Sequence, residues 1–249
     1  MCAATVTATA LERRPLPPLP NRLALAFGRP TWLEARQRRE RLALRQHPVT
    51  PPTGRGRPLL IVPGYGGSDE SMAPLAAWLV AGGFEVTVAP LERNIRSSSW
   101  AADRVGDALE ALGAPAVLVG HSRGGQAARV AAARNPSRVS QLVTLGAPVR
   151  HHYPEHILLR TSFEALRAAA FLRLFAEWNP AAERAFAADL FAPFPDGLPW
   201  TSIWTPTDGY VAPEACLDSK AVSMQVSCTH RGLVESVASF EAIAAVLDE

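Results

Sequence analysis

The feature that most constrains the fold is a regular alternation of short apolar runs with helical segments, which begins at residue 59. Strands are expected at residues 59–62, 84–89, 116–119, 139–145, 200–205 and 222–227. Helices are expected between and after them, at 72–81, 99–112, 126–134 and 232–247. Because continuous apolar runs indicate strands that are buried on both faces, we expect a mostly parallel central sheet with helices on both faces. The sequence therefore predicts an α/β fold with right-handed crossovers.

One segment, at about 150–195, interrupts this alternation and is rich in Phe and Leu. Two helices are expected in it, around 162–178 and 180–191. One interpretation is a short helical lid that closes over an apolar site. The other is a pair of extra helices that simply pack on the core, and the sequence leaves both interpretations open.

The first 58 residues differ in composition from the rest of the chain. Residues 1–58 hold 11 Arg and 3 acidic residues, a balance of +8, whereas residues 59–249 hold 14 basic and 20 acidic residues, a balance of −6. Within this basic, Pro-rich leader a helix is expected at 31–46, with Thr31 as N-cap and Glu34 at the capping-box position. A basic amphipathic helix can lie on an anionic membrane surface, although docking on the domain with a solvated Arg face is the commoner arrangement.

Composition also limits the protein classes that come into question. No stretch approaches the length of apolar sequence that a transmembrane helix needs, and no secretory signal peptide is evident. We therefore expect a cytoplasmic protein without a nucleic-acid partner, although an Arg-rich leader leaves a transit peptide open. Cys2, Cys216 and Cys228 are too few for a disulfide scaffold and lack the spacing of a zinc site. Cys216 and Cys228 could pair or remain thiols, and the oligomeric state is left open.

The sequence GHSRG at residues 120–124 fits the pattern G-x-S-x-G. An expected strand precedes it and an expected helix follows it, which is the strand–turn–helix context of a nucleophile elbow. Glycines flank Ser122 because such a turn is strained and the neighbouring backbones approach closely. Ser122 is therefore the candidate nucleophile, and the alternative is a glycine-rich turn with an incidental serine.

A second glycine-rich loop, PGYGG at residues 63–67, follows the first expected strand. A tetrahedral acyl intermediate needs backbone N–H groups aimed at its developing negative charge. In an elbow enzyme, one N–H comes from the residue after the nucleophile and the other from the loop after an early strand. We therefore expect the N–H groups of Arg123 and Tyr65 to form an oxyanion hole. The alternative is an ordinary turn, and the motifs of phosphate-binding loops are absent.

A serine nucleophile needs a base, and the base needs an orienting acid. His230 follows the last expected strand and Asp208 follows the strand at 200–205, so both loops open at the same edge of the sheet as Ser122. We expect His230 to be the base and Asp208 the acid. His121 is expected to point elsewhere, although it is adjacent to Ser122. The remaining histidines are assigned to the leader or to lid and surface positions: His47, His151, His152 and His156.

Together these motifs resemble those of the α/β-hydrolase superfamily, in its lipase/esterase-like branch. The resemblance covers roughly residues 58–247 and is carried by PGYGG at 63–67, GHSRGG at 120–125, LGAP at 145–148, TDGYV at 207–211 and THRGL at 229–233. One departure is Pro63-Gly64, where lipases of this branch usually have His-Gly. The backbone role expected of Tyr65 survives that change.

The resemblance implies that residues 59–249 form a catalytic domain that hydrolyses carboxylic esters through a Ser-His-Asp triad and an acyl-enzyme. It implies a small-molecule ester or lipid-like substrate and no cofactor or metal. A thioesterase, an amidase or an acyltransferase on the same triad is the alternative within enzymes, since the fold does not fix the substrate. A non-catalytic binding protein that keeps the fold is the alternative of a different class.

Overall fold

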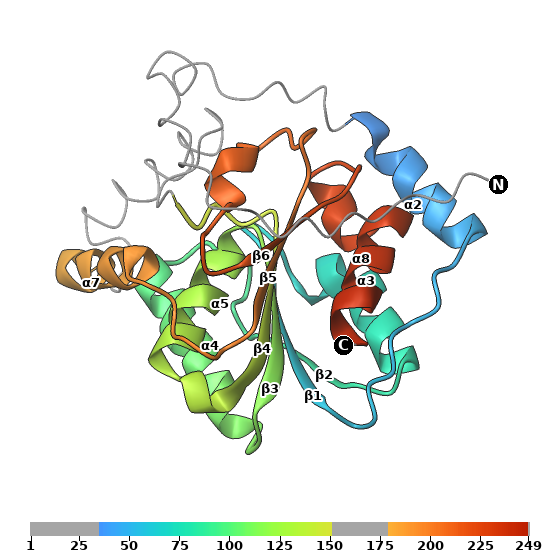
Figure 1. The fold of residues 1–249 in the computed structure, drawn as a ribbon. Coiled ribbons are helices and arrows are strands. Elements are labelled where there is room, and N and C mark those ends of the chain that lie inside the picture. Colours follow the sequence, from blue (N-terminus) through green and yellow to red (C-terminus); the bar gives the residue numbers. More distant parts are fainter. Residues whose placement is uncertain (1–34, 151–178, 249) are drawn as a thin grey trace, which may run out of the picture.

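The sheet at the centre of the protein is parallel throughout the described residues. The computed structural model describes residues 35–150 and 179–248, and its strands lie in the order β2-β1-β3-β4-β5-β6. They are β1 (Pro58–Val62), β2 (Glu85–Val88), β3 (Ala116–His121), β4 (Val139–Leu145), β5 (Trp200–Trp204) and β6 (Val222–Gln225). The strand order reverses at β1, which lies between β2 and β3, and such a switch point opens a crevice at the carboxyl ends of the strands. The predicted α/β architecture is confirmed (Figure 1).

Helices cover both faces of this sheet (Figure 1). One face is covered by α3 (Asp69–Ala81) and α8 (Val237–Leu247), and the other by α4 (Ser98–Ala111) and α5 (Arg123–Arg134). Outside these layers lie α7 (Pro180–Phe191), which contacts α4 and α5, and α2 (Gln37–Gln46), which contacts α8. Short 3-10 helices complete the described chain: η2 (Pro136–Arg138), η3 (Pro213–Cys216) and η4 (Arg231–Val234).

The central strands bury side chains on both of their faces. In β1, Leu59 and Ile61 belong to the core on the side of α3 and α8, whereas Leu60 and Val62 belong to the core on the side of α4 and α5. Successive side chains of a strand point to opposite faces, so a strand covered on both sides is apolar at every position. This double burial is the reason that residues 59–62 of β1 and 116–119 of β3 appear in the sequence as continuous apolar runs.

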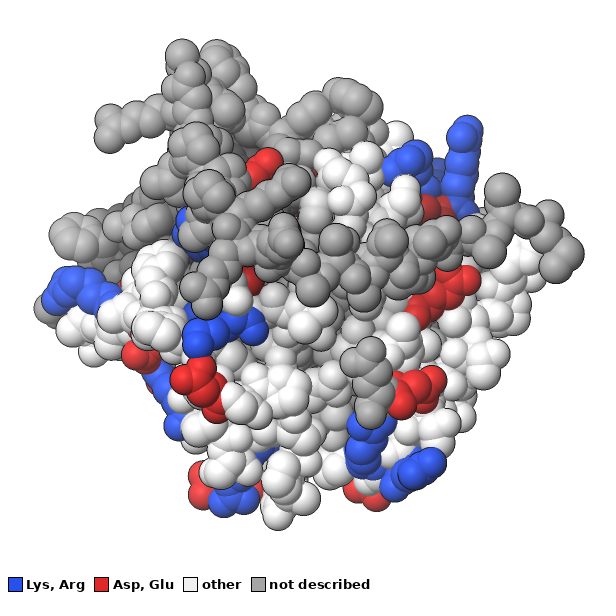
Figure 2. Space-filling model, in the orientation of Figure 1, with Lys and Arg blue, Asp and Glu red and all other residues white. Residues whose placement is uncertain are grey.

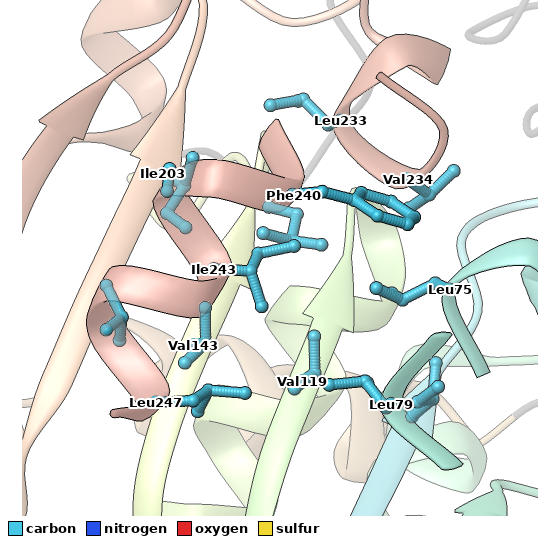
Figure 3. Packing of buried hydrophobic residues seen from close by; sticks show 14 of the residues in the cluster. Leu75, Leu79, Val119, Val143, Ile203, Leu233, Val234, Phe240, Ile243 and Leu247 are labelled. Carbon is cyan, nitrogen blue, oxygen red and sulfur yellow. The ribbon is translucent and has the colours of Figure 1, made fainter. Parts of the chain in front are cut away.

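Figure 3 shows the first of these two cores from close by. Val119 of β3 and Val143 of β4 lie between side chains of α3 and α8, among them Leu79 and Ile243. These four side chains are almost completely inaccessible to solvent. The core therefore fixes the sheet against α3 and α8, directly below the loops at the carboxyl ends of the strands.

The helix predicted at residues 180–191 is confirmed as α7. Its Phe186 and Leu190 are buried against Ala102 of α4 and Val130 of α5. In these contacts α7 is an extra helix on the outer helical layer, and the lid over the site stays a prediction. The helix expected at 162–178 lies outside the described residues.

The leader helix is docked on the domain. α2 contacts α8 and η4, and Leu44 and Val49 pack against the core of α3 and α8. The Trp78 indole N–H also donates a hydrogen bond to the Val49 carbonyl at 2.8 Å. Basic side chains gather over α2 at the upper right of Figure 2. The predicted caps, Thr31 and Glu34, lie outside the described residues.

Two further properties concern the described part of the chain. None of its helices is long and apolar enough to cross a membrane. Cys216 lies at the end of η3 and Cys228 follows β6, and both are buried as thiols. The alternative in which these two residues form a disulfide is therefore not realised.

Candidate active site

Ser122 lies at the sharp turn between β3 and α5. Its backbone has φ 54° and ψ −127°, a conformation that side-chain-bearing residues rarely adopt and that stores strain. Two backbone hydrogen bonds of 2.8 Å hold the turn, one from the Ser122 N–H to the Leu145 carbonyl and one from the Gly125 N–H to the Ser122 carbonyl. The strand–turn–helix context that the sequence predicted for GHSRG is confirmed.

A cavity of about 280 Å³ exposes Ser122 together with residues from distant parts of the chain. Tyr65 comes from the loop after β1, and His230 comes from the loop after β6. Helix α2 contributes two more lining residues, Gln37 and Arg41. Tyr210, from the loop after β5, also lines it, so the carboxyl ends of four strands and the leader helix meet around one space, and most of the residues predicted for the site border it.

Asp208 and His230 form a buried pair beside this cavity. His230 Nδ1 lies 2.6 Å from Asp208 Oδ2, and neither residue is more than slightly exposed. The other carboxylate oxygen, Oδ1, accepts hydrogen bonds from the backbone N–H groups of Tyr210 at 2.8 Å and Val211 at 2.7 Å. These bonds fix the carboxylate, which accepts the Nδ1–H of His230. The imidazole Nε2 is then the nitrogen that can accept a proton.

Gly64 brings the loop after β1 against the turn at Ser122. A Cβ at Gly64 would lie 3.0 Å from His121 Nδ1 and 3.1 Å from the Ser122 Cβ. The missing side chain is therefore what allows the two backbones to approach. The following turn is closed by a 3.0 Å hydrogen bond from the Gly67 N–H to the Gly64 carbonyl.

Gly146, in the LGAP motif, lies beside the Asp208–His230 pair. Its φ is +56°, and a Cβ there would lie 3.3 Å from both Asp208 Oδ2 and His230 Nδ1. The same Cβ would lie only 2.5 Å from Leu233 Cδ1. The glycine of the LGAP motif therefore leaves room for Asp208 and His230. The sequence alone did not indicate this role of the motif.

The two residues predicted for the oxyanion hole lie on either side of the elbow. Tyr65 lines the cavity with Ser122 and belongs to the turn that follows β1. Arg123 directly follows Ser122 and is the first residue of α5. The N–H groups in the first turn of a helix point outward from its terminus rather than to a carbonyl of the same helix. The positions are therefore compatible with two backbone donors that face one reacting atom.

The Arg123 side chain makes contacts that the sequence did not reveal. Its buried guanidinium donates to the Asn94 carbonyl at 2.7 Å and to the Arg96 carbonyl at 2.6 Å. The Asn94 side-chain amide in turn donates to the Pro63 carbonyl at 2.7 Å. Burial lowers the pKa of Arg123 to about 10, so the group stays cationic at neutral pH. Arg123 and Asn94 therefore connect the elbow with the strand end that leads into the loop after β1.

His121 lies in the site, and the expectation that it points elsewhere is wrong. Its ring centroid is 4.8 Å from that of His230, and it lines the same cavity. His121 Nε2 is 3.2 Å from the His230 carbonyl oxygen, which can only accept, so Nε2 carries the hydrogen. Burial and the neighbouring His230 lower the pKa of His121 to about 3, which makes it a neutral donor at neutral pH. Its position at the end of β3, next to the nucleophile, was the signal in the sequence.

The other predicted histidines lie apart from this site or outside the described ranges. His47 follows α2 and is exposed. His151, His152 and His156 fall in the part of the chain that is not described. Within residues 35–150 and 179–248, the structure brings together no group of three side chains that could hold a metal ion.

The chain resembles known proteins in sequence and in structure. A family model described as alpha/beta hydrolase fold matches residues 59–192, more than half of the chain. None of the curated proteins that were compared matches it.

Among solved structures, one of the metagenome-derived lipolytic enzymes LipS and LipT is 19% identical with a TM-score of 0.56, over 80% of this chain and 98% of that chain. MGS-MChE2, an alpha/beta hydrolase enzyme from the metagenome of lagoon sediments of Mar Chica, Morocco, is 19% identical with a TM-score of 0.53, over 78% and 90%. Lipase BlEst2 of Bacillus licheniformis is 15% identical with a TM-score of 0.53, over 80% and 95%. At these identities the likeness shows the fold.

Proposed function

Because this chain belongs to the α/β-hydrolase fold family, we propose that it is a serine hydrolase that cleaves carboxylic esters of small molecules. Ser122 is the nucleophile, His230 is the general base and acid, and Asp208 orients His230. The observation that carries the proposal is the 2.6 Å contact between Asp208 and His230 at the wall of the cavity that exposes Ser122.

The reaction proceeds in two halves. His230 Nε2 removes the proton of Ser122 as Oγ attacks the ester carbonyl, and the N–H groups of Tyr65 and Arg123 hold the oxyanion of the tetrahedral intermediate. His230 then donates its proton to the leaving alcohol, and an acyl-enzyme on Ser122 remains. A water molecule, deprotonated by His230, attacks this acyl group, and the collapse of the second intermediate releases the acid and restores Ser122.

The charges around His230 support this role. The Asp208 carboxylate receives two backbone N–H groups in addition to His230, which hold it in one orientation. An ionised Asp208 stabilises the imidazolium that forms during each half of the reaction. His121 is the nearest other imidazole, and its lowered pKa keeps it neutral, so it adds no opposing positive charge.

The test compares the wild-type protein with Ser122→Ala on p-nitrophenyl acetate and butyrate. We expect kcat to fall by about 10³-fold or more in Ser122→Ala and by a similar factor in His230→Ala, because each removes a member of the triad. Ser137→Ala, which changes an exposed serine of η2, serves as the matched control with unchanged kcat. Turnover by a folded Ser122→Ala protein at the wild-type rate would contradict the proposal.

A further inference from the structure

The leader helix holds the loop that carries His230. Glu40 of α2 accepts a hydrogen bond from the Thr229 N–H with both carboxylate oxygens, at 3.0 and 3.1 Å. Its Oε2 also accepts the Thr229 hydroxyl hydrogen at 2.6 Å. Thr229 immediately precedes His230 in the sequence. One carboxylate of the leader therefore fixes the backbone next to the proposed base.

The residue that Glu40 holds is itself part of a fixed turn. Thr229 has no exposed surface, and its hydroxyl oxygen accepts the Gly232 N–H at 2.9 Å. A Cβ at Gly232 would overlap Glu40 Oε2, so the glycine is what lets the carboxylate reach Thr229. Because the Thr229 N–H is buried, loss of its acceptor leaves a donor that water cannot easily satisfy. The position of His230 thus depends on an acceptor that comes from outside the loop.

Two more contacts join the N-terminal end of α2 to the loops that carry Asp208 and His230. The Arg36 guanidinium donates to the Thr207 hydroxyl at 2.9 Å, one residue before Asp208. The Gln37 amide donates to Glu235 at 2.7 Å, at the far end of η4. The helix therefore holds the residue before the proposed acid, the residue before the proposed base and the residue after η4.

We propose that Glu40 is a positioning residue for His230, an inference that rests on the proposed function. A general base transfers protons efficiently only when its geometry is held within a fraction of an ångström. Asp208 contacts Nδ1 of the His230 ring, and His121 donates to the His230 carbonyl oxygen. Glu40 accepts the N–H of Thr229, the residue before His230. Glu40 lies outside residues 59–192, the part of the chain that the family model matches. The leader thus helps to position a residue of the proposed catalytic site.

The experiment measures ester hydrolysis by the full chain with Glu40→Ala, Glu40→Gln and the control Glu110→Ala, which removes an exposed carboxylate from α4. The active-site concentration is taken from titration with a fluorophosphonate. We expect Glu40→Ala to lower kcat per active site about tenfold, because the buried donors of Thr229 lose their acceptor. KM should change by less than about threefold, because the acyl site itself is unaltered.

Two further readouts separate positioning from general support of the fold. The rate of fluorophosphonate labelling should fall with kcat in Glu40→Ala, because His230 also activates Ser122 in that reaction. Glu40→Gln should recover most of the loss, because the amide oxygen can still accept the Thr229 N–H. A lowered melting temperature with wild-type kcat per active site would overturn the proposal, as would wild-type kcat at an unchanged melting temperature.

If Glu40→Ala does not fold, Glu40→Asp replaces it. This variant keeps the charge on an exposed helix and withdraws the carboxylate from Thr229 by one methylene. We expect a several-fold lower kcat, and wild-type kcat in Glu40→Asp overturns the proposal. Failure of the proposed function looks different, because Ser122→Ala would then hydrolyse the esters as fast as the wild-type protein.

Discussion

The neutral state of buried His121 gives the protein a measurable dependence of stability on pH. Burial lowers the pKa of His121 from 6.5 to about 3. Below pH 6.5 the unfolded chain takes up a proton at this residue, whereas the folded protein does not take it up until the pH approaches 3. The unfolded state therefore binds more protons in this window, and the free energy of unfolding falls as the pH is lowered.

The magnitude follows from the two pKa values. At about pH 7 the unfolded imidazole is mostly neutral, and protonation stabilises the unfolded state by much less than about 1 kcal/mol. At about pH 5 the same residue stabilises the unfolded state by about 2 kcal/mol, since its ordinary pKa lies roughly 1.5 units higher. Folded His121 binds almost no proton at either pH. The expected loss of stability from this one residue is thus about 2 kcal/mol between the two conditions.

The assay is urea-induced unfolding of the wild-type protein and His121→Gln at about pH 7 and pH 5. The glutamine amide does not titrate and can still donate to the His230 carbonyl. We expect the wild-type protein to lose about 2 kcal/mol more than the variant between the two pH values. His47→Gln removes an exposed histidine and should leave the wild-type loss nearly unchanged. Equal losses in the wild-type protein and His121→Gln would refute the reasoning.

Three further substitutions, two near the proposed triad and one in α7, have separate expected outcomes. Asn94→Ala removes the side-chain amide that accepts from the Arg123 guanidinium and donates to the Pro63 carbonyl, so kcat on p-nitrophenyl butyrate should fall about tenfold, and an unchanged kcat would count against that link. Phe186→Ala should lower the free energy of urea unfolding by about 3–5 kcal/mol and leave kcat unchanged, and a loss below about 1 kcal/mol would contradict its buried packing. Gly146→Ala should lower both the melting temperature and kcat, because a positive φ and a crowded Cβ oppose it, and wild-type values would exclude that crowding.

Secondary structure was predicted best where the pattern of apolar residues and the residues that end an element agree. β4 runs over the residues expected from the sequence, because a segment rich in Val and Leu is bounded there by the end of η2 and by Gly146. The last helix was expected as one segment near 232–247, but the structure divides it into η4 and α8. Ser236 accepts a hydrogen bond from the Ser239 N–H and begins α8, while η4 forms the turn that follows His230. The cap at Ser236 therefore divides a segment that the apolar periodicity predicted as one continuous helix.

The candidate site was predictable to the extent that it depends on topology. Ser122, Asp208 and His230 each follow a strand, and parallel strands bring such loops to one edge of the sheet. His121 was missed although the end of β3 places it beside Ser122, whereas Glu40 was missed because its contact is not set by topology. Glu40 lies 189 positions before Thr229, and no sequence pattern links the two residues. The leader is rich in arginine, but its contact with the loop that carries His230 is made by an acidic residue, Glu40.

The central claim is that Ser122 is the residue that becomes acylated, and the most direct measurement is mass spectrometry of the protein after reaction with a fluorophosphonate. We expect one adduct per chain, on the peptide that contains Ser122. The adduct should be absent in Ser122→Ala and should form about 10³-fold more slowly in His230→Ala. An adduct on another residue, or equal labelling of the wild-type and Ser122→Ala proteins, would contradict the account.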